Sequence, residues 1–121
     1  MNSLQRAAFD HEITHARELI ARDEFAAGFA HLERAHVIGQ ANVVLHVKSH
    51  WLMLKLEIQR QQPKAVLGQL LRIVLGALGS AVGIFPVGNT GGTNVSMFKR
   101  MPIAPELQKI IDGDAQPDAR L

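Results

Sequence analysis

The sequence has no cysteine among its 121 residues. This absence excludes disulfides, thiolate metal ligands and cysteine nucleophiles together, and it fits a reducing compartment. A strong charge of one sign is also missing, because 13 lysines and arginines interleave with 11 acidic residues to give a net charge of +2. So small an excess gives little reason to expect a nucleic-acid partner.

The sequence also shows no signal peptide and no sign of a second domain. Its first residues, "MNSLQRAAFDHE", are polar and include acid, which predicts no secretory signal peptide and a cytoplasmic location. No run alternates apolar and polar residues as a half-buried strand would. With 47% apolar residues, the length suits one domain with a modest core. We expect a single helical domain over 1–112 and a flexible tail over 113–121.

Helix signals are frequent, and they predict an all-α, four-helix bundle-like domain. Ser3 and Asp23 are suited to cap the first two helices, and Pro63 is suited to open the fourth. The Gly, Pro and Asn content of residues 86–95 predicts a Gly-rich C-terminal loop. The expected helices cover residues 4–22, 24–38, 43–61 and 63–85, with a short one at 105–111.

The first two helices have the spacing of a tetratricopeptide-like helical hairpin. Small and apolar residues between 19 and 40 stand at separations like the packing positions of that repeat. One unit is visible, whereas three are normally needed for a stable solenoid. The spacing therefore indicates either a shared way of packing or a protein-interaction module. The residues concerned are Leu19, Gly28, Leu32 and Ala35.

The fourth expected helix is apolar enough to raise the question of a membrane span. Gln69 and Arg72 interrupt it, which favours a core helix over a transmembrane one, and we expect no membrane partner. Its glycines share one face with Arg72, a pattern of close backbone approach. That face is expected to receive either the following loop or a second copy, as a homodimer. The glycines are Gly68, Gly76, Gly79 and Gly83.

The segment "HEITH" at 11–15 matches the His-Glu-x-x-His pattern of zinc metallopeptidases. At 100° per residue, Glu12 falls in the apolar arc of its helix, His15 at the edge of that arc, and His11 further out. A carboxylate that faces a core is costly unless it is paired or bound to a metal. Because the sequence predicts no strand to line a peptide cleft, a protease is disfavoured.

Inward-facing histidines recur on the next two helices. Glu33 and His36 form a second Glu-x-x-His pair, and His46 and His50 stand one turn apart on the third helix. Facing helices build carboxylate–histidine metal sites in this way, often dinuclear ones. We therefore expect a metal ion as the partner. The candidate metal ligands are Glu33, His36, His46, His50, Glu12 and His15.

The sequence alone leaves other roles open for these residues. The histidines can serve in a buried polar network, and a buried glutamate can pair with Arg34 or Arg72, while His31 projects to the far, solvated face. The loop at 86–95 lacks the ending of a P-loop, and no catalytic residue can be assigned. A ligand set of nitrogen and oxygen suits Zn, Fe, Mn, Co, Ni or Cu(II).

Four segments in order carry a resemblance to a known family: "LERAHVIGQ" (32–40), "HVKSHWLML" (46–54), "VLGQLLRIV" (66–74) and "PVGNTGGTNVSMFKRMPI" (86–103). The chain resembles, over roughly residues 5–111, a small bacterial family known as domain of unknown function number three thousand seven hundred and three. Its members are short helical cytosolic proteins, often encoded among heavy-metal resistance genes. The resemblance implies metal handling. The family pattern falls on Glu33, His36, Gln40, His46 and His50.

The sequence is therefore compatible with three functions. The first is metal binding in heavy-metal handling or resistance, through a carboxylate–histidine site. The second is a tetratricopeptide-like interaction module with a buried polar network. The third is a dinuclear-metal oxidoreductase or hydrolase.

Overall fold

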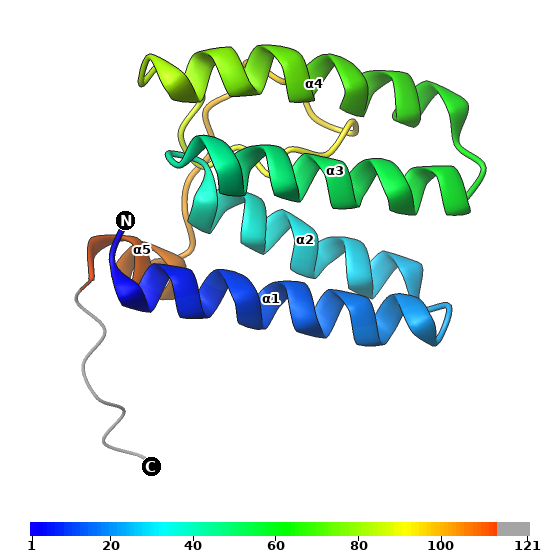
Figure 1. Cartoon of the computed structure of the whole chain (residues 1–121), viewed down its shortest axis with the longest axis horizontal. Helices are drawn as coiled ribbons and strands as arrows, with labels where there is room; N and C mark the ends of the chain where they lie inside the picture. The colour runs from blue at the N-terminus through cyan, green and yellow to red at the C-terminus, as the bar shows by residue number, and fades with distance from the viewer. Residues whose placement is uncertain (114–121) are drawn as a thin grey trace.

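The structure is a computed structural model and describes residues 1–113. Within this range all regular secondary structure is helical, so the all-α prediction is confirmed. Figure 1 shows α1 to α4 side by side in chain order, with α5 against the start of α1. The predicted tail lies outside the described residues apart from Gly113, which is the C-cap of α5. The helices are α1 (Ser3–Ala21), α2 (Phe25–Gly39), α3 (Val43–Gln59), α4 (Pro63–Ala81) and α5 (Pro105–Asp112).

Two of the predicted helix caps are wrong. Asn2, not Ser3, caps α1: its side chain accepts a hydrogen bond from the Gln5 amide at 2.7 Å, and the Gln5 side chain returns the contact. Asp23 does not cap α2, because it takes a left-handed φ of 59° in the connecting turn. Pro63 does open α4, as predicted, but α4 ends at Ala81 rather than at 85.

The first two helices form the predicted hairpin. Gly28 allows a close crossing, because a Cβ there would lie 2.7 Å from Cγ1 of Ile20 on α1. The likeness to a tetratricopeptide repeat stays a prediction. Side chains from α1, α2, α3 and α5 fill the core beneath this hairpin, among them Phe9, Ile13, Leu32, Ile38, Leu45, Met53, Leu56 and Leu107.

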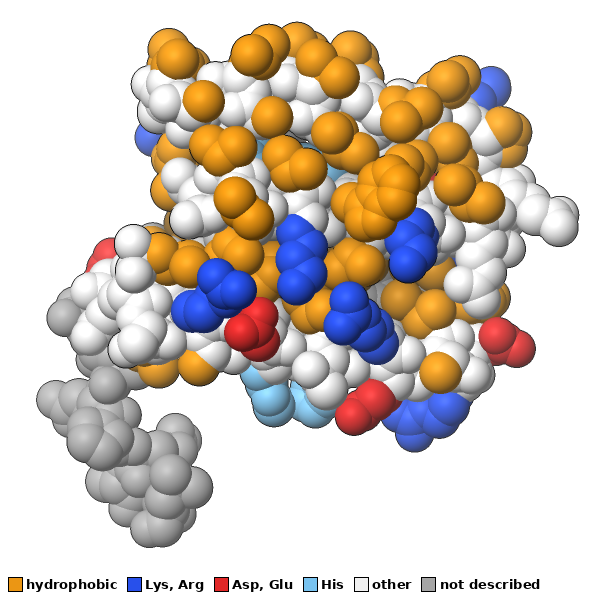
Figure 2. Space-filling view, viewed as in Figure 1, with side chains coloured by type: hydrophobic (Ala, Val, Ile, Leu, Met, Phe, Trp, Pro, Cys, Tyr) orange, Lys and Arg blue, Asp and Glu red, His pale blue; other side chains and the backbone are white. Residues whose placement is uncertain are grey.

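The fourth helix is covered on one face only, so the expectation of a core helix is wrong for its outer face. Gln69 and Ser80 are its buried residues, whereas the opposite side exposes a row of leucines and valines (Figure 2). By length and composition, α4 is the one helix in residues 1–113 that could cross a membrane, and 11% of its most apolar window is buried.

The glycine face of α4 is the face that is covered. A Cβ at Gly68 would lie 2.7 Å from the Thr93 side chain, and one at Gly76 would lie 3.0 Å from the His46 ring. This face therefore receives the following loop, which is one of the two expectations, and it also packs against α3. The homodimer through this face stays a prediction.

Candidate metal centre

Three histidines meet in the interior between α2, α3 and α4. His36 comes from α2, and His46 and His50 come from successive turns of α3, which places both rings on one face. Each is at most 3% exposed. The Nε2 atom of His50 lies 3.0 Å from Nε2 of His36 and 3.2 Å from Nε2 of His46. The arrangement, called the inner triad below, brings one ligand nitrogen of each ring to a common point.

The other ring nitrogen of His36 and of His50 faces a fixed acceptor. Nδ1 of His36 lies 2.7 Å from the carbonyl oxygen of Asn89, which can only accept. Nδ1 of His50 lies 2.7 Å from Oε1 of Gln69. The Gln69 amide nitrogen donates to the Gly91 carbonyl at 3.0 Å, so Oε1 must be the atom that faces the ring. Both histidines therefore carry their hydrogen on Nδ1.

His46 also carries its hydrogen on Nδ1, because this atom contacts the Ser80 hydroxyl. Ser80 Oγ donates its only hydrogen to the carbonyl oxygen of Gln40 at 2.8 Å. The hydroxyl oxygen can then only accept from Nδ1 of His46, to which it is hydrogen-bonded. All three imidazoles thus carry hydrogen on Nδ1, and three Nε2 lone pairs face one another with no hydrogen between them. A cation placed among them removes this repulsion.

Burial also keeps the triad uncharged at neutral pH. It lowers the pKa of His46 and of His50 to about 4. The pKa of His36 lies well below its ordinary value, because of burial first and then because of the neighbouring His50 and His46. Neutral imidazole is the form that binds a metal ion.

The distances and surroundings fit a metal site. Ligand bonds of 2.0–2.1 Å in a tetrahedral centre put two nitrogens about 3.3 Å apart, close to the 3.0 and 3.2 Å seen here. An oxygen acceptor on Nδ1 is also what metal-bound histidines normally have, since it fixes the tautomer and the ring orientation. Three protein ligands leave a fourth position for another group.

A pocket of about 480 Å³ adjoins the triad. All three histidines line it, together with side chains of α4 and of the loop that follows. Two glycines leave room for the rings. A Cβ at Gly91, whose φ is +83°, would lie 2.6–2.8 Å from atoms of the His36 ring, and one at Gly76 would lie 3.2 Å from Nε2 of His46. Larger residues at these positions would push the ligands out of place.

The family model described as "Protein of unknown function (DUF3703)" matches residues 3–111. The chain belongs to this family. The resemblance stated from the sequence is confirmed to that extent, and the family description names no activity. No curated protein and no solved structure matches the chain.

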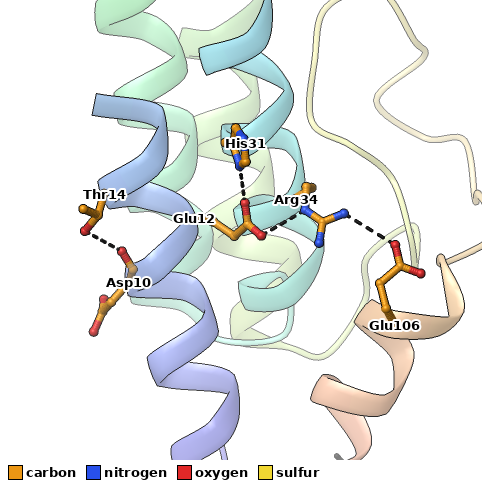
Figure 3. Close-up of polar contacts among 6 residues, drawn as sticks. All are labelled: Asp10, Glu12, Thr14, His31, Arg34 and Glu106. Carbon is orange, nitrogen blue, oxygen red and sulfur yellow. Dashed lines mark hydrogen bonds and ion pairs between the residues drawn. The ribbon is translucent and has the colours of Figure 1, made fainter. Parts of the chain in front are cut away.

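Glu12, one of the predicted ligands, is paired with other side chains. It is buried, and its two oxygens lie 2.9 Å from Nε of Arg34 and 2.5 Å from Nδ1 of His31 (Figure 3). Arg34 also approaches Glu106 on α5 at 3.5 Å. Burial works to raise the pKa of Glu12, but the hydrogen bonds from His31 and Arg34 and their charges outweigh it, and the pKa is lowered.

The remaining predicted ligands lie apart from the triad. His15 is half-buried on α1, with its ring centroid 5.2 Å from that of His31 and 4.3 Å from that of the exposed His11. Glu33 is half-buried and lines hollows beside Thr90, and burial raises its pKa. His31 is not on the far face as expected: its side chain faces α1 and contacts Glu12, although 30% of it stays exposed.

Sequence reasoning missed the three residues that orient the triad: Gln69, Ser80 and Asn89. Gln69 carries a signal in the sequence, because it is an uncharged polar residue in the middle of an apolar helix. Ser80 and Asn89 carry none, since their partners are 34 and 53 positions away in the chain. Asn89 also holds the loop together, with its amide nitrogen donating to the carbonyls of Ser96 and Lys99 at 2.8 and 2.7 Å.

Proposed function

We propose that the protein binds one transition-metal ion through Nε2 of His36, His46 and His50. The observation that supports this is the oxygen that faces every Nδ1. These oxygens place the hydrogen on Nδ1 and leave three Nε2 lone pairs facing one another. A purely structural polar network would need a hydrogen between at least two of these atoms. A metal ion satisfies all three lone pairs at once and leaves every Nδ1 contact intact.

The ligand chemistry favours a mononuclear centre for a borderline metal. Imidazole nitrogens without thiolate suit Zn, Co, Ni, Cu(II) or Fe. Glu12 is already hydrogen-bonded to Arg34 and His31, and Glu33 lines other hollows, so a carboxylate-bridged pair of ions is less favoured than a single ion. The role we propose is to hold or buffer such a metal in the cytoplasm as part of heavy-metal handling.

A catalytic role is a second proposal, favoured by the pocket that adjoins the triad. A zinc ion with three histidine ligands and an open fourth position can activate a bound water, as in carbonic anhydrase. The interaction module proposed from the hairpin spacing has no comparable support in the site, because it assigns no role to the converging nitrogens.

The test is metal content and affinity in a matched pair of variants on α2. Purified wild type is expected to carry about one ion per chain by elemental analysis. His36→Ala should weaken Zn²⁺ binding roughly 100-fold or more, since the site loses one of three ligands. His31→Ala removes a histidine from the same helix and should leave the affinity unchanged. Circular dichroism of both variants confirms that the helices are retained.

Two outcomes would contradict the proposal. One is wild-type protein that contains no metal and takes up none of Zn, Co, Ni, Cu, Fe or Mn tightly. The other is an equal loss of affinity in both variants, which would assign binding to histidines exposed outside the triad.

A further inference from the structure

The pocket beside the triad is positively charged. Among the described residues that line it are Arg72 and Arg100, and none of them is a carboxylate. The three histidines are neutral ligands, so they offset none of the charge of a divalent ion. A centre of this kind places a metal cation next to a guanidinium in a partly buried space, which is costly unless an anion is also bound. The positive charge of the pocket therefore favours an anionic ligand.

Arg72 is held in place but keeps one donor unused. Its Nη1 and Nη2 atoms donate to the carbonyls of Gly68 and Val95 at 3.1 and 3.0 Å. Its Nε is buried and has no hydrogen-bond partner within residues 1–113. The guanidinium lies close enough to the triad for its charge to contribute to the lowered pKa of His36 and His50, after burial and other causes. A fixed cation beside the ligands is suited to binding an anion there.

The remaining wall of the pocket is mainly apolar, with Gln40 and Asn89 as its polar side chains. Its volume of about 480 Å³ falls in the range of small-molecule sites, about 300–1,000 Å³, and far exceeds the roughly 30 Å³ of a water-sized ion. A simple inorganic anion would therefore leave most of the space unused. The apolar residues come from α4 and from the loop that follows it: Leu75, Ile84, Phe85, Pro86, Met97 and Phe98.

We infer that this pocket binds a small organic anion, with its charged head at the metal and Arg72 and its apolar body against Leu75, Phe85 and Phe98. The inference rests on the proposed metal site and names the class of ligand that this site takes. The head group is a carboxylate or a phosphate, since both carry oxygens for a metal and a guanidinium.

The test uses the Co²⁺-loaded full chain, whose visible absorption reports a change of ligand at the metal. Acetate, butyrate, hexanoate and hexyl phosphate are titrated, with hexanol as the uncharged control. We expect affinity to rise about 3- to 4-fold for each methylene that becomes buried. Hexanol should bind roughly 100-fold more weakly than hexanoate, because it lacks the charge. The tighter of hexanoate and hexyl phosphate identifies the head group.

Two variants separate the head from the body of the ligand. Arg72→Gln should weaken hexanoate about 10-fold at unchanged cobalt content, whereas Arg17→Gln, on the exposed surface of α1, should have no effect. Because Arg72 also holds two carbonyls, a second variant avoids any effect on folding. Phe98 is 76% exposed, and Phe98→Ser should reduce the gain from butyrate to hexanoate while acetate binding is unchanged.

The outcomes are distinguishable from those of the metal test. If cobalt binds at one ion per chain but neither hexanoate nor hexyl phosphate changes its spectrum, the inference is wrong and the metal site stands. Equal affinity for acetate and hexanoate, or for hexanol and hexanoate, also overturns it. If cobalt does not bind, the metal site and this inference fall together.

Discussion

The protein carries two groups of histidines that differ in what their second ring nitrogen contacts. In the inner triad each Nδ1 donates to an oxygen that can only accept, which leaves Nε2 for a cation. In the outer group, formed by His11, His15 and His31, the Nδ1 of His31 contacts Glu12, whose charge Arg34 already offsets. The comparison teaches that spacing alone does not identify a ligand. The atom that contacts Nδ1 indicates whether Nε2 is available to bind a metal ion.

Burial widens the difference between the two groups. The triad histidines are at most 3% exposed, and burial lowers the pKa of each of them. The outer group lies at the surface of α1 and α2, where water is available to every ring. The triad is therefore a pre-organised site whose Nε2 atoms carry no proton at pH 7, and the outer group is a partly exposed polar face around an ion pair.

The largest expected effect is on stability as the pH falls. The pKa of His46 and His50 is about 4 in the folded protein against an ordinary value of 6.5. Because the unfolded chain then binds more protons, their contribution is complete above about pH 6.5 and is lost toward pH 4. We expect metal-free protein to lose about 2 kcal/mol for each of the two between pH 7 and pH 5, as measured by urea unfolding.

A pair of variants sharpens this pH comparison. His46→Gln should remove about half of the loss that His46 and His50 cause between pH 7 and 5. The double change of His11 and His31 to Gln should leave the loss as it is. If instead the outer change abolishes the pH dependence, the triad does not titrate as described.

A smaller effect is expected from the residues that orient the rings. Ser80→Ala removes the acceptor of His46 Nδ1 and should weaken metal binding about 10- to 100-fold, as loss of a partner behind a metal-bound histidine does. Ser49→Ala is the matched control, because the Ser49 hydroxyl donates to the backbone carbonyl of His46 at 2.7 Å and does not contact the ring. Isothermal titration with Zn²⁺ measures both. Equal losses would show that packing, rather than the tautomer, sets the affinity.

The smallest effect is expected in the outer group. Glu12→Gln keeps the shape of the side chain but weakens its contacts with Arg34 and His31, and should cost about 1 kcal/mol of stability at pH 7. Since the pKa of Glu12 is lowered from 4.5, its contribution is present above about pH 4.5 and is lost below it. Metal content should not change. A loss of metal in this variant would place Glu12 in the metal site and would contradict the difference between the two histidine groups.

The sequence predicts where the helices lie, but it does not predict which faces of the fourth helix are covered. Periodicity and Pro63 place the starts of α3 and α4, because these signals are local. The turn at Asp23 and the cap at Asn2 escape prediction, since several neighbouring polar residues could cap either helix. The outer face of α4 could not be assigned, because apolar periodicity indicates a face that avoids water without saying whether this chain covers it.

The site was predictable only for residues whose signal is local. His46 and His50 are four positions apart on one helix, and His36 falls on the apolar side of α2, so all three could be proposed from spacing. Glu12 was proposed on the same grounds and pairs with Arg34 instead, as one alternative foresaw. No spacing rule reaches Asn89, because its carbonyl meets His36 across 53 positions of chain.

The order of these residues along the chain has a consequence for how the centre is assembled. The three ligands lie between residues 36 and 50, whereas the oxygens that fix two of their rings come from α4 and the third from the loop after it. A growing chain therefore presents the histidines before their orienting partners exist. The arrangement proposed to bind a metal is complete only after α4 and the loop have folded back over α2 and α3. If the triad binds a metal as proposed, uptake of the ion would mark the completion of folding in a newly made molecule.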